Sequence, residues 1–428
     1  DAVDLATHLQ ELGRLEFLFE QRTGEETAYV FKHALTREVA YGSLTKPRRA
    51  RLHAGFADWI LRLGEGRDEH APLLAHHFAE AVRPEDADLV WEDGAEELER
   101  LRSHAVTWLE RAGDLAVGRY ELDDALALFQ RAVELEPHEL HQSELWRKIG
   151  LAYALKFEGE EFWTAMQRSL AVCEDREKCA NSYADLSLQT AIRSGMWRRR
   201  PDEELVSGWI EQALALAAPE SEARAKALIA RCFWSRKDMR DSAEEASALA
   251  ERLGNRELQS HALGARTVTA FADGEYIEAL RLAENRLELV SGLSDPDHIS
   301  DVYELAIPAY CVVGRFEEAR RLAAVHDEVV EPLSPHHRVH GVAVVLEVEE
   351  LAGGWEQIAA LGGRTETIVD DNVSTPCIRN ARSLLLTALA AAHRGDAETA
   401  TYYEERAQDV MTEGYESIVA APLAQLAL

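Results

Sequence analysis

Apolar and small residues between positions 106 and 139 recur every three or four residues, which is the spacing of one face of an α-helix. The pattern predicts two helices joined by a short turn, in a unit of about 34 residues whose second helix ends at Pro137. Small residues are expected where the two helices nearly touch, and Phe129 is expected to fill the gap to the next unit. The positions predicted to pack are Leu109, Ala112, Gly113, Ala125, Phe129, Ala132 and Pro137.

These are the spacings of a tetratricopeptide repeat, a unit that cannot bury its apolar face alone. Further copies should therefore follow, and weaker copies fit the sequence around Ala243, Ala279, Ala319 and Ala400. Gly274, Gly314 and Gly395 precede three of these copies and are predicted to lie in the loop inside each hairpin. We predict an all-α fold over residues 101–428, a right-handed superhelix of about seven or eight tetratricopeptide-like helical hairpins. The fit is poorest at 176–210 and 332–365. Such stacks usually present a surface to another molecule, so the pattern favours a binding function.

The first hundred residues show a different order of elements. Apolar spacing predicts a helix ending near Gly13, strands over 16–21 and 27–32 joined by a turn at 23–25, and then two helices, the second beginning after Pro47. This order is similar to that of a winged helix, an α module with a β-hairpin. A further helix is predicted over 72–81, followed by an acidic segment. We place the boundary of a first domain, 1–100, near residue 100.

The stretch from Tyr29 to Leu44 resembles the junction motif of bacterial signal-transduction ATPases of the STAND class. Residues 48–53 and 75–78 are similar to the next two landmarks of that family, and residues 112–114 open the repeats. The four matches occur in the family's order and cover residues 29–137. The residues that carry the junction resemblance are Phe31, His33, Glu38, Tyr41, Arg48, His53, His76 and His77.

In that family an ATPase and a repeat arm are joined to an adenylyl or guanylyl cyclase domain or to a LuxR-type DNA-binding domain. The resemblance implies that the winged helix packs against the nucleotide-binding module, while the repeats sense an effector or hold a partner. The chain has no Gly-x-x-x-x-Gly-Lys-Ser/Thr loop for phosphates and no recognisable cyclase metal-binding segment, so we expect neither activity in it. Because it opens at Asp1 within an amphipathic pattern, we expect it to be a fragment with catalytic parts upstream.

Charge and composition narrow the choice of partners. The 77 acidic and 46 basic residues give a net charge of −31, which repels phosphate backbones and anionic membranes, so nucleic acid is a disfavoured partner. No apolar stretch approaches the roughly 18 residues of a membrane span, and the first thirty residues lack a charged head followed by an apolar run. We therefore expect neither a membrane anchor nor an export signal. The five scattered cysteines fit reduced, buried thiols and a cytoplasmic location.

Candidate binding residues come from two places. Arg198, Arg199 and Arg200 form a basic run beside Trp197, either a site for an anionic group or a solvated loop that answers the acidic run at 202–204. The first helix of each hairpin should line the concave face, including Glu110, Asp114 and Arg147, and later His261, Asp301 and Glu304. That face suits a basic or mixed peptide, unless the side chains are merely solvated.

Other candidate chemistry is weaker. His336 and His340 lie one helical turn apart and can present two imidazoles to a metal, but no third ligand is evident, and His76 and His77 lack a His-Glu-x-x-His context. We therefore expect packing or surface histidines, and neither a metal nor a cofactor. The basic run at 46–51 is expected to pair with carboxylates rather than with DNA. No catalytic constellation anchors an enzyme function.

The leading hypothesis is a non-catalytic regulatory segment that binds a protein partner or effector through the superhelix and biases an upstream ATPase. The partner is either the ATPase or effector domain of the same polypeptide or a separate protein or peptide. One alternative is a passive docking or oligomerisation scaffold. Another is the small-molecule-sensing arm of a transcriptional regulator, with tryptophans as stacking surfaces.

Overall fold

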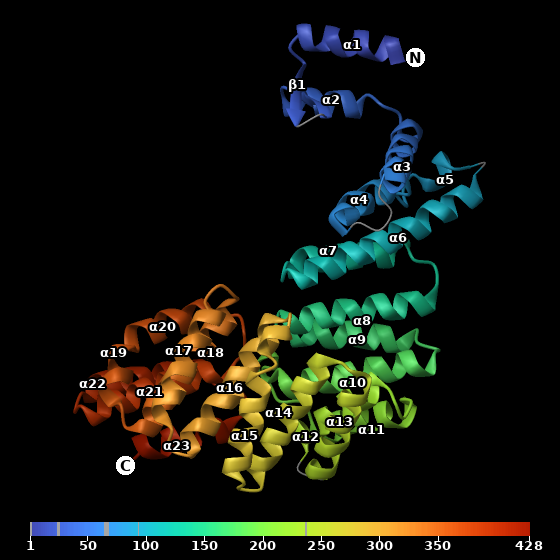
Figure 1. Cartoon of the computed structure of the whole chain (residues 1–428). Coiled ribbons are helices and arrows are strands. Elements are labelled where there is room, and N and C mark those ends of the chain that lie inside the picture. Colours follow the sequence, from blue (N-terminus) through green and yellow to red (C-terminus); the bar gives the residue numbers. More distant parts are fainter. Residues whose placement is uncertain (1, 24–25, 64–67, 93, 236–237) are drawn as a thin grey trace. The chain divides into compact units, whose positions relative to one another are not determined.

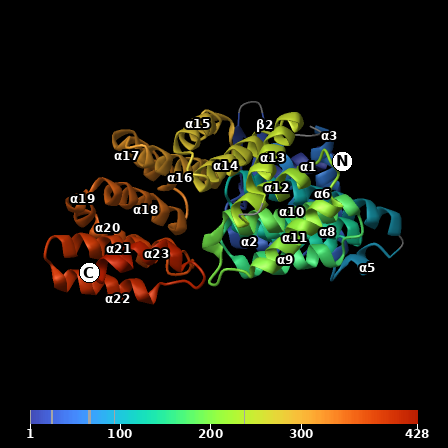
Figure 2. The same cartoon turned by 90° about the horizontal axis from the view of Figure 1, so that it is seen from below.

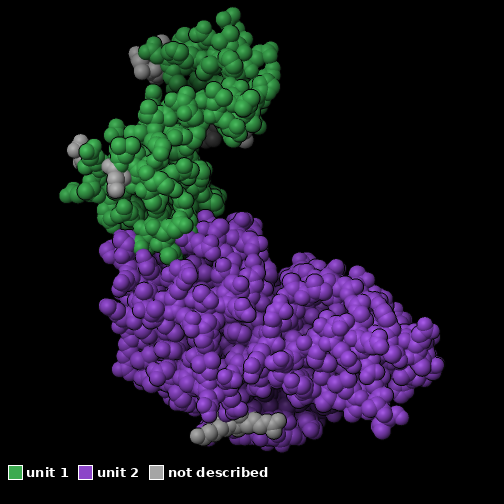
Figure 3. Space-filling model, turned by 180° about the vertical axis from the view of Figure 1, so that it is seen from behind, with its two compact units in different colours: residues 1–115, 131–136 green, residues 116–130, 137–428 purple. Residues whose placement is uncertain are grey.

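The computed structural model of the chain describes residues 2–23, 26–63, 68–92, 94–235 and 238–428. These residues form two compact units, drawn in different colours in Figure 3. Unit 1 comprises residues 1–115 and 131–136, and unit 2 comprises residues 116–130 and 137–428. The predicted domain boundary near residue 100 stays a prediction, because the helical hairpin that follows it is divided between the two units.

Unit 1 contains the only strands among the described residues, a two-stranded antiparallel sheet in which Leu18 pairs with Phe31. The predicted strands are confirmed to within two residues, whereas the turn residues Gly24 and Glu25 lie outside the described residues. The elements are α1 (Ala2–Arg14), β1 (Leu18–Thr23), β2 (Glu26–Phe31), α2 (Ala34–Gly42), α3 (Lys46–Leu63), η1 (Asp68–His70), α4 (Ala71–Ala81), α5 (Ala87–Val90) and most of α6 (Ala95–Gly118).

Unit 2 is a succession of helices, labelled in Figure 1. They are α7 (Leu122–Leu135, whose last residues belong to unit 1), α8 (Glu139–Leu155), α9 (Gly159–Ala171), α10 (Arg176–Ile192), η2 (Ser194–Met196), α11 (Glu203–Leu216), α12 (Glu222–Trp234), α13 (Met239–Leu253), α14 (Arg256–Ala272), α15 (Tyr276–Leu287), η3 (Val290–Gly292), α16 (Pro296–Val312), α17 (Phe316–Val330), α18 (Pro335–Ala352), α19 (Trp355–Ala360), α20 (Gly362–Asp371), α21 (Ile378–His393), α22 (Ala397–Asp409) and α23 (Glu416–Leu426).

Consecutive helices of unit 2 pack as hairpins, for example α8 with α9 and α21 with α22. The glycines predicted inside three hairpin loops, Gly274, Gly314 and Gly395, adopt φ values of 75°, 78° and 76°. This left-handed conformation ends a helix and is easily reached only by glycine. The all-α class with tetratricopeptide-like hairpins is therefore confirmed, and three of its loops contain the predicted glycine.

The first helices of successive hairpins stack on one another, because α10 contacts α12, α12 contacts α14, α14 contacts α16, and α16 contacts α18. In Figure 2 this stack curves round, so that its late helices return towards its early ones. Residues 193–202, which we call the α10–α11 loop, meet the segment before α23, where Arg199 and Glu413 form an isolated parallel β-bridge.

The core consists of small and apolar side chains at the helix contacts. The predicted packing residues Leu109, Ala112, Ala125, Phe129 and Ala132 are all buried, and Pro137 follows the end of α7. Within the described residues, no helix combines the length and the apolar character needed to cross a membrane.

One expectation about cysteines is wrong. We expected reduced thiols, whereas Cys173 and Cys179 are joined in a disulfide across the turn between α9 and α10. The turn brings their Cα atoms to 5.8 Å, a normal separation for such a bond, and the six-residue spacing gives no recognisable motif. Cys232, Cys311 and Cys377 are free and buried, as predicted.

Candidate functional site

The candidate site lies inside unit 2, where the first helices of the later hairpins face the end of α10. Their inward side chains enclose a cavity of about 60 Å³. That volume holds a few water molecules or an ion, and is far below the roughly 300–1,000 Å³ of a typical small-molecule pocket. Its walls are formed by Phe157, Ile192, Arg193, Ser194, Gly195, His261, Asp297, His298, Asp301, Glu304, His336, His337 and His340.

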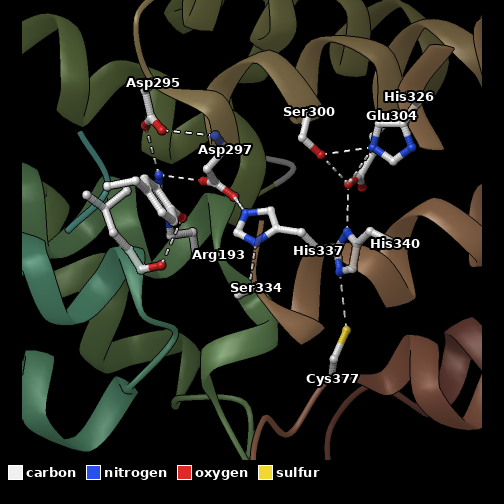
Figure 4. A network of polar contacts seen from close by, with 12 residues as sticks. Arg193, Asp295, Asp297, Ser300, Glu304, His326, Ser334, His337, His340 and Cys377 are labelled. Atoms are coloured by element: carbon white, nitrogen blue, oxygen red, sulfur yellow. Dashed lines mark hydrogen bonds and ion pairs between the residues drawn. The ribbon is translucent and has the colours of Figure 1, made fainter. Parts of the chain in front are cut away.

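Arg193, the residue that ends α10, provides a buried positive charge on one wall. Its side chain is 6% exposed, and its Nη2 lies 2.5 Å from Asp297 Oδ2 and 3.4 Å from Asp295 Oδ2 (Figure 4). Asp295 is the N-cap of α16 and accepts the backbone N–H of Asp297. Asp297 also contacts His337, with 3.0 Å between Oδ1 and Nε2. Burial alone would raise the pKa of the Asp297 carboxyl, but Arg193 and His337 hold it below its usual range.

Glu304 is the centre of a second group of contacts on the same face of α16. Its Oε1 lies 2.6 Å from His340 Nδ1, and its Oε2 lies 3.2 Å from an Arg379 nitrogen. Ser300 donates its hydroxyl to Glu304 at 3.3 Å. Against the effect of burial, His340 and Arg379 keep the pKa of Glu304 well below its usual value. Burial favours the neutral His340 ring, yet the Glu304 carboxylate raises the pKa of His340 to about 10.

His336 lies between these groups and differs from its neighbours. It is 2% exposed, and neither ring nitrogen has a hydrogen-bond partner among the described residues. Its ring packs against that of Phe157, with 3.7 Å between the centroids. Cys377, the N-cap of α21, lies next to these histidines, with 3.4 Å between its Sγ and His340 Nε2.

The predicted concave-face residues have two kinds of surroundings. His261, Asp301 and Glu304 all line the cavity. Arg147 forms ion pairs with Glu144 and with Asp185. The Asp185 side chain is 1% exposed, and one of its carboxylate oxygens also lies 2.7 Å from Lys226 Nζ. Arg147 therefore neutralises a buried carboxylate inside unit 2. In unit 1, Glu110 is half-buried and Asp114 is exposed.

The basic run of the α10–α11 loop is exposed but held in place. Arg200 lies over the Trp234 ring, 4.6 Å from its centroid, and its backbone N–H donates to the Glu413 carbonyl. Arg199 lies 3.9 Å from the Glu413 carboxylate, and the Arg198 carbonyl accepts the Glu413 N–H. The run thus contacts Glu413, over two hundred positions away, rather than the acidic residues 202–204 that we considered.

Unit 1 brings three residues of the junction motif together. Tyr41 Oη lies 2.8 Å from His53 Nε2, and His53 Nδ1 lies 2.7 Å from His77 Nδ1. Burial and the nearby His53 lower the pKa of His77 to about 4. His76, the neighbour of His77 in the sequence, is exposed. The remaining motif residues are also exposed, namely Phe31, His33, Glu38 and Arg48. Three of the eight motif residues therefore form a polar cluster, and the other five are exposed.

A shallow groove of about 700 Å³ lies on unit 2 along α17, α18 and α20. Four of its residues are acidic and two are basic, namely Asp327, Glu328, Glu331, Asp371, Arg338 and Arg364. Arg364 lies 2.8 Å from Asp327, so it offsets part of this negative charge.

Sequence reasoning missed Arg193, Asp297, His337, Arg379 and Cys377. They come from the ends of four different helices, where no fixed spacing relates them. Two signals pointed to the site: the pair His336 and His340, one helical turn apart, and the concave-face register of His261, Asp301 and Glu304. The partner residues of these side chains become visible only when the hairpins stack.

No family model and no curated protein match the chain. Among solved structures, a Signal Transduction ATPase with Numerous Domains (STAND) protein with a tetratricopeptide repeat sensor, from Pyrococcus horikoshii, has 13% identity and a TM-score of 0.51. The match covers 94% of this chain and 57% of that chain, so this chain spans little more than half of that protein.

Two further solved structures have lower scores. Yeast Tom70 has 11% identity and a TM-score of 0.42, over 92% of this chain and 96% of that chain. A Rap protein complexed with competence and sporulation factor has 11% identity and a TM-score of 0.40, over 99% and 100%. At these identities the comparisons establish fold alone, and the chain shares the tetratricopeptide-like helical fold of the STAND sensor protein.

Proposed function

We propose that residues 1–428 form a non-catalytic regulatory segment of a STAND-class signalling ATPase. In this proposal unit 2 binds a protein partner or effector, and unit 1 docks against the nucleotide-binding module of the ATPase. Binding biases the ATPase between its off and on states, which requires that the partner has different affinities for the two states. The fold shared with a longer STAND protein and the junction motif of unit 1 support the proposal.

The observation that carries the proposal is the apolar surface of unit 1. More than half of the exposed large apolar side chains of the described residues lie between Leu5 and Leu73, in less than a fifth of the chain. Leu35 is 71% exposed and Val39 66% exposed, and α2 has no buried residue. Exposed apolar side chains at this density are typical of a surface that another domain covers.

The acidic groove along α17, α18 and α20 favours a partner with positive charge. Its carboxylates outnumber its guanidinium groups, and the whole chain carries a net charge of −31. We propose that a basic or mixed peptide segment of the partner occupies this groove, because complementary charge accelerates encounter and suppresses wrong partners.

The test uses the ATPase polypeptide that carries residues 1–428. The double variant Leu35→Glu, Val39→Glu alters the proposed docking surface, and the matched control Ile277→Glu, Leu351→Glu alters side chains that are 74% and 59% exposed in unit 2. We expect the first variant to change ATP turnover several-fold and the control to leave it unchanged. Equal turnover in wild type and both variants would refute the docking role. A partner whose affinity ignores the bound nucleotide would favour the scaffold alternative.

A further inference from the structure

The corner of the cavity formed by α18 and the start of α21 has the donor set of a transition-metal site. His336, His340 and Cys377 each offer one donor atom, and these atoms all lie within 4.8 Å of one another. Sequence spacing identified only the two histidines, and the third donor comes from a different hairpin. Two imidazoles and a thiolate are a set that Zn²⁺ binds readily.

We propose that unit 2 binds one Zn²⁺ ion through His336, His340 and Cys377, with a fourth coordination position open to the cavity. In a tetrahedral zinc site the donor atoms are roughly 3.3–3.8 Å apart. The 3.4 Å between His340 Nε2 and Cys377 Sγ fits this range, and shifts of about 1 Å bring in His336.

His336 supplies an independent observation that points to a ligand. A buried imidazole normally forms at least one hydrogen bond, because an unsatisfied buried polar group costs about 1–3 kcal/mol. Among the described residues His336 has none at either nitrogen, although it is 2% exposed and lines the cavity. A metal ion bound to one of these nitrogens satisfies it.

The surroundings of His340 match those of a metal-bound histidine. Such a ring almost always donates its second N–H to a carboxylate or carbonyl, which fixes the tautomer and orients the other nitrogen towards the metal. His340 Nδ1 lies 2.6 Å from Glu304, which leaves Nε2 facing Cys377 (Figure 4). Glu304 is in turn held by Arg379 and Ser300, so it acts as a positioning residue.

Gly195 permits this arrangement. A Cβ atom at position 195 would lie 2.5 Å from His336 Cε1 and 3.6 Å from Cys377 Sγ. Only glycine at position 195 therefore lets the α10–α11 loop lie this close to the three donor residues. A bound ion would connect α18 and α21 beneath this loop. Coordination would release two protons to solvent, one from the Cys377 thiol and one from His340 Nε2.

The experiment uses the purified full chain, stripped of metal and kept reduced. Zn²⁺ affinity is measured by competition with a chromophoric chelator, and Co²⁺ replaces Zn²⁺ to give a spectrum. We expect one thiolate-ligated ion per chain, seen as a sulfur-to-cobalt charge-transfer band. Cys377→Ser should abolish this band and weaken Zn²⁺ binding more than about 100-fold, and Glu304→Gln should weaken it about 10–100-fold.

Controls separate this site from other places where metal binds. Cys311→Ser changes a buried cysteine outside the cluster and should leave affinity and band unchanged, as should replacement of Cys173 and Cys179 by serine. The cluster of His53, His76 and His77 contains no cysteine, so an ion bound there gives no thiolate band. A cobalt complex of the wild type without that band would overturn the proposal, even if the Cys377 variant failed to fold. Wild-type affinity in a folded Cys377→Ser chain would do so too.

Discussion

The guanidinium of Arg193 lies 2.5 Å from the carboxylate of Asp297, and this ion pair joins the end of α10 to the first turn of α16. Both side chains are largely withdrawn from solvent, with exposures of 6% and 15%. When one partner of a buried pair is removed, the other keeps an uncompensated charge.

Arg193→Ala should therefore lower the free energy of unfolding of unit 2 by about 3–5 kcal/mol, because Asp295 and Asp297 then repel each other inside the protein. Urea unfolding followed by circular dichroism measures the change. The exposed Arg198→Ala variant provides the comparison and should unfold like the wild type. Similar midpoints for both variants would show that the buried ion pair contributes little.

His298 predicts an acid sensitivity. Burial, assisted by the positive charges of Arg286 and Arg193, lowers its pKa from an ordinary 6.5 to about 3. Between pH 6.5 and pH 3 the unfolded chain therefore binds one more proton at this position than the folded chain does. The stability that neutral His298 contributes is complete above pH 6.5 and declines as the pH falls. From pH 7 to pH 5 the loss is about 2 kcal/mol.

The measurement compares unfolding free energies of wild type and His298→Gln from pH 4 to pH 7. The unfolding free energy of the wild type should fall more steeply with decreasing pH than that of His298→Gln. The difference in slope corresponds to up to one bound proton, which is about 1.4 kcal/mol per pH unit. The exposed His76→Gln variant should follow the wild type. Parallel curves for wild type and His298→Gln would contradict a buried neutral His298.

Gly195 and Gly208 should respond in opposite ways to replacement by alanine. At position 195 the new methyl group meets the His336 ring, which cannot retreat because it packs against Phe157. We expect Gly195→Ala to destabilise by about 1–3 kcal/mol. At position 208, inside α11, no atom of the described residues would lie within 4 Å of the new methyl group, and alanine should stabilise by about 0.5–1 kcal/mol. Thermal unfolding of the two variants under identical conditions checks the difference in sign.

Phe129 tests the repeat register. Its side chain is 1% exposed, and the Lys148 ammonium lies 5.8 Å from its ring centroid. Phe129→Ala should cost about 3–5 kcal/mol by leaving a cavity. Leu140→Ala, at a position that is 45% exposed, should cost far less. A loss below about 1 kcal/mol for Phe129→Ala would mean that the predicted packing role is wrong.

The local structure could be predicted from the sequence because it depends on short-range spacing. Ala112 and Phe129 mark helices of the first hairpin, and Gly274 and Gly314 mark the turns of two later ones. Each signal depends on residues of a single hairpin, and the structure has these helices and turns where expected. The hydrophobic alternation around Leu18 and Phe31 likewise located the β-hairpin.

The candidate site could not be predicted in the same way. Arg193 contacts Asp297, and Cys377 contacts His340, only because the stack brings these hairpins together, and its curvature accumulates from small rotations between hairpins that no local pattern encodes. The disulfide between Cys173 and Cys179 was missed for a simpler reason, since it depends on how one turn folds back.

The contact between the α10–α11 loop and Glu413 also affects how the chain folds. In an open stack each repeat touches only its neighbours, so repeats unfold gradually and stability is roughly a sum of local terms. Here Arg199 and Arg200, between α10 and α11, pair with a segment near the C-terminal end of unit 2, which closes the intervening contacts into a loop. Unit 2 should consequently fold more slowly than an open array of the same helices, and the late hairpins should lose their structure together with α10.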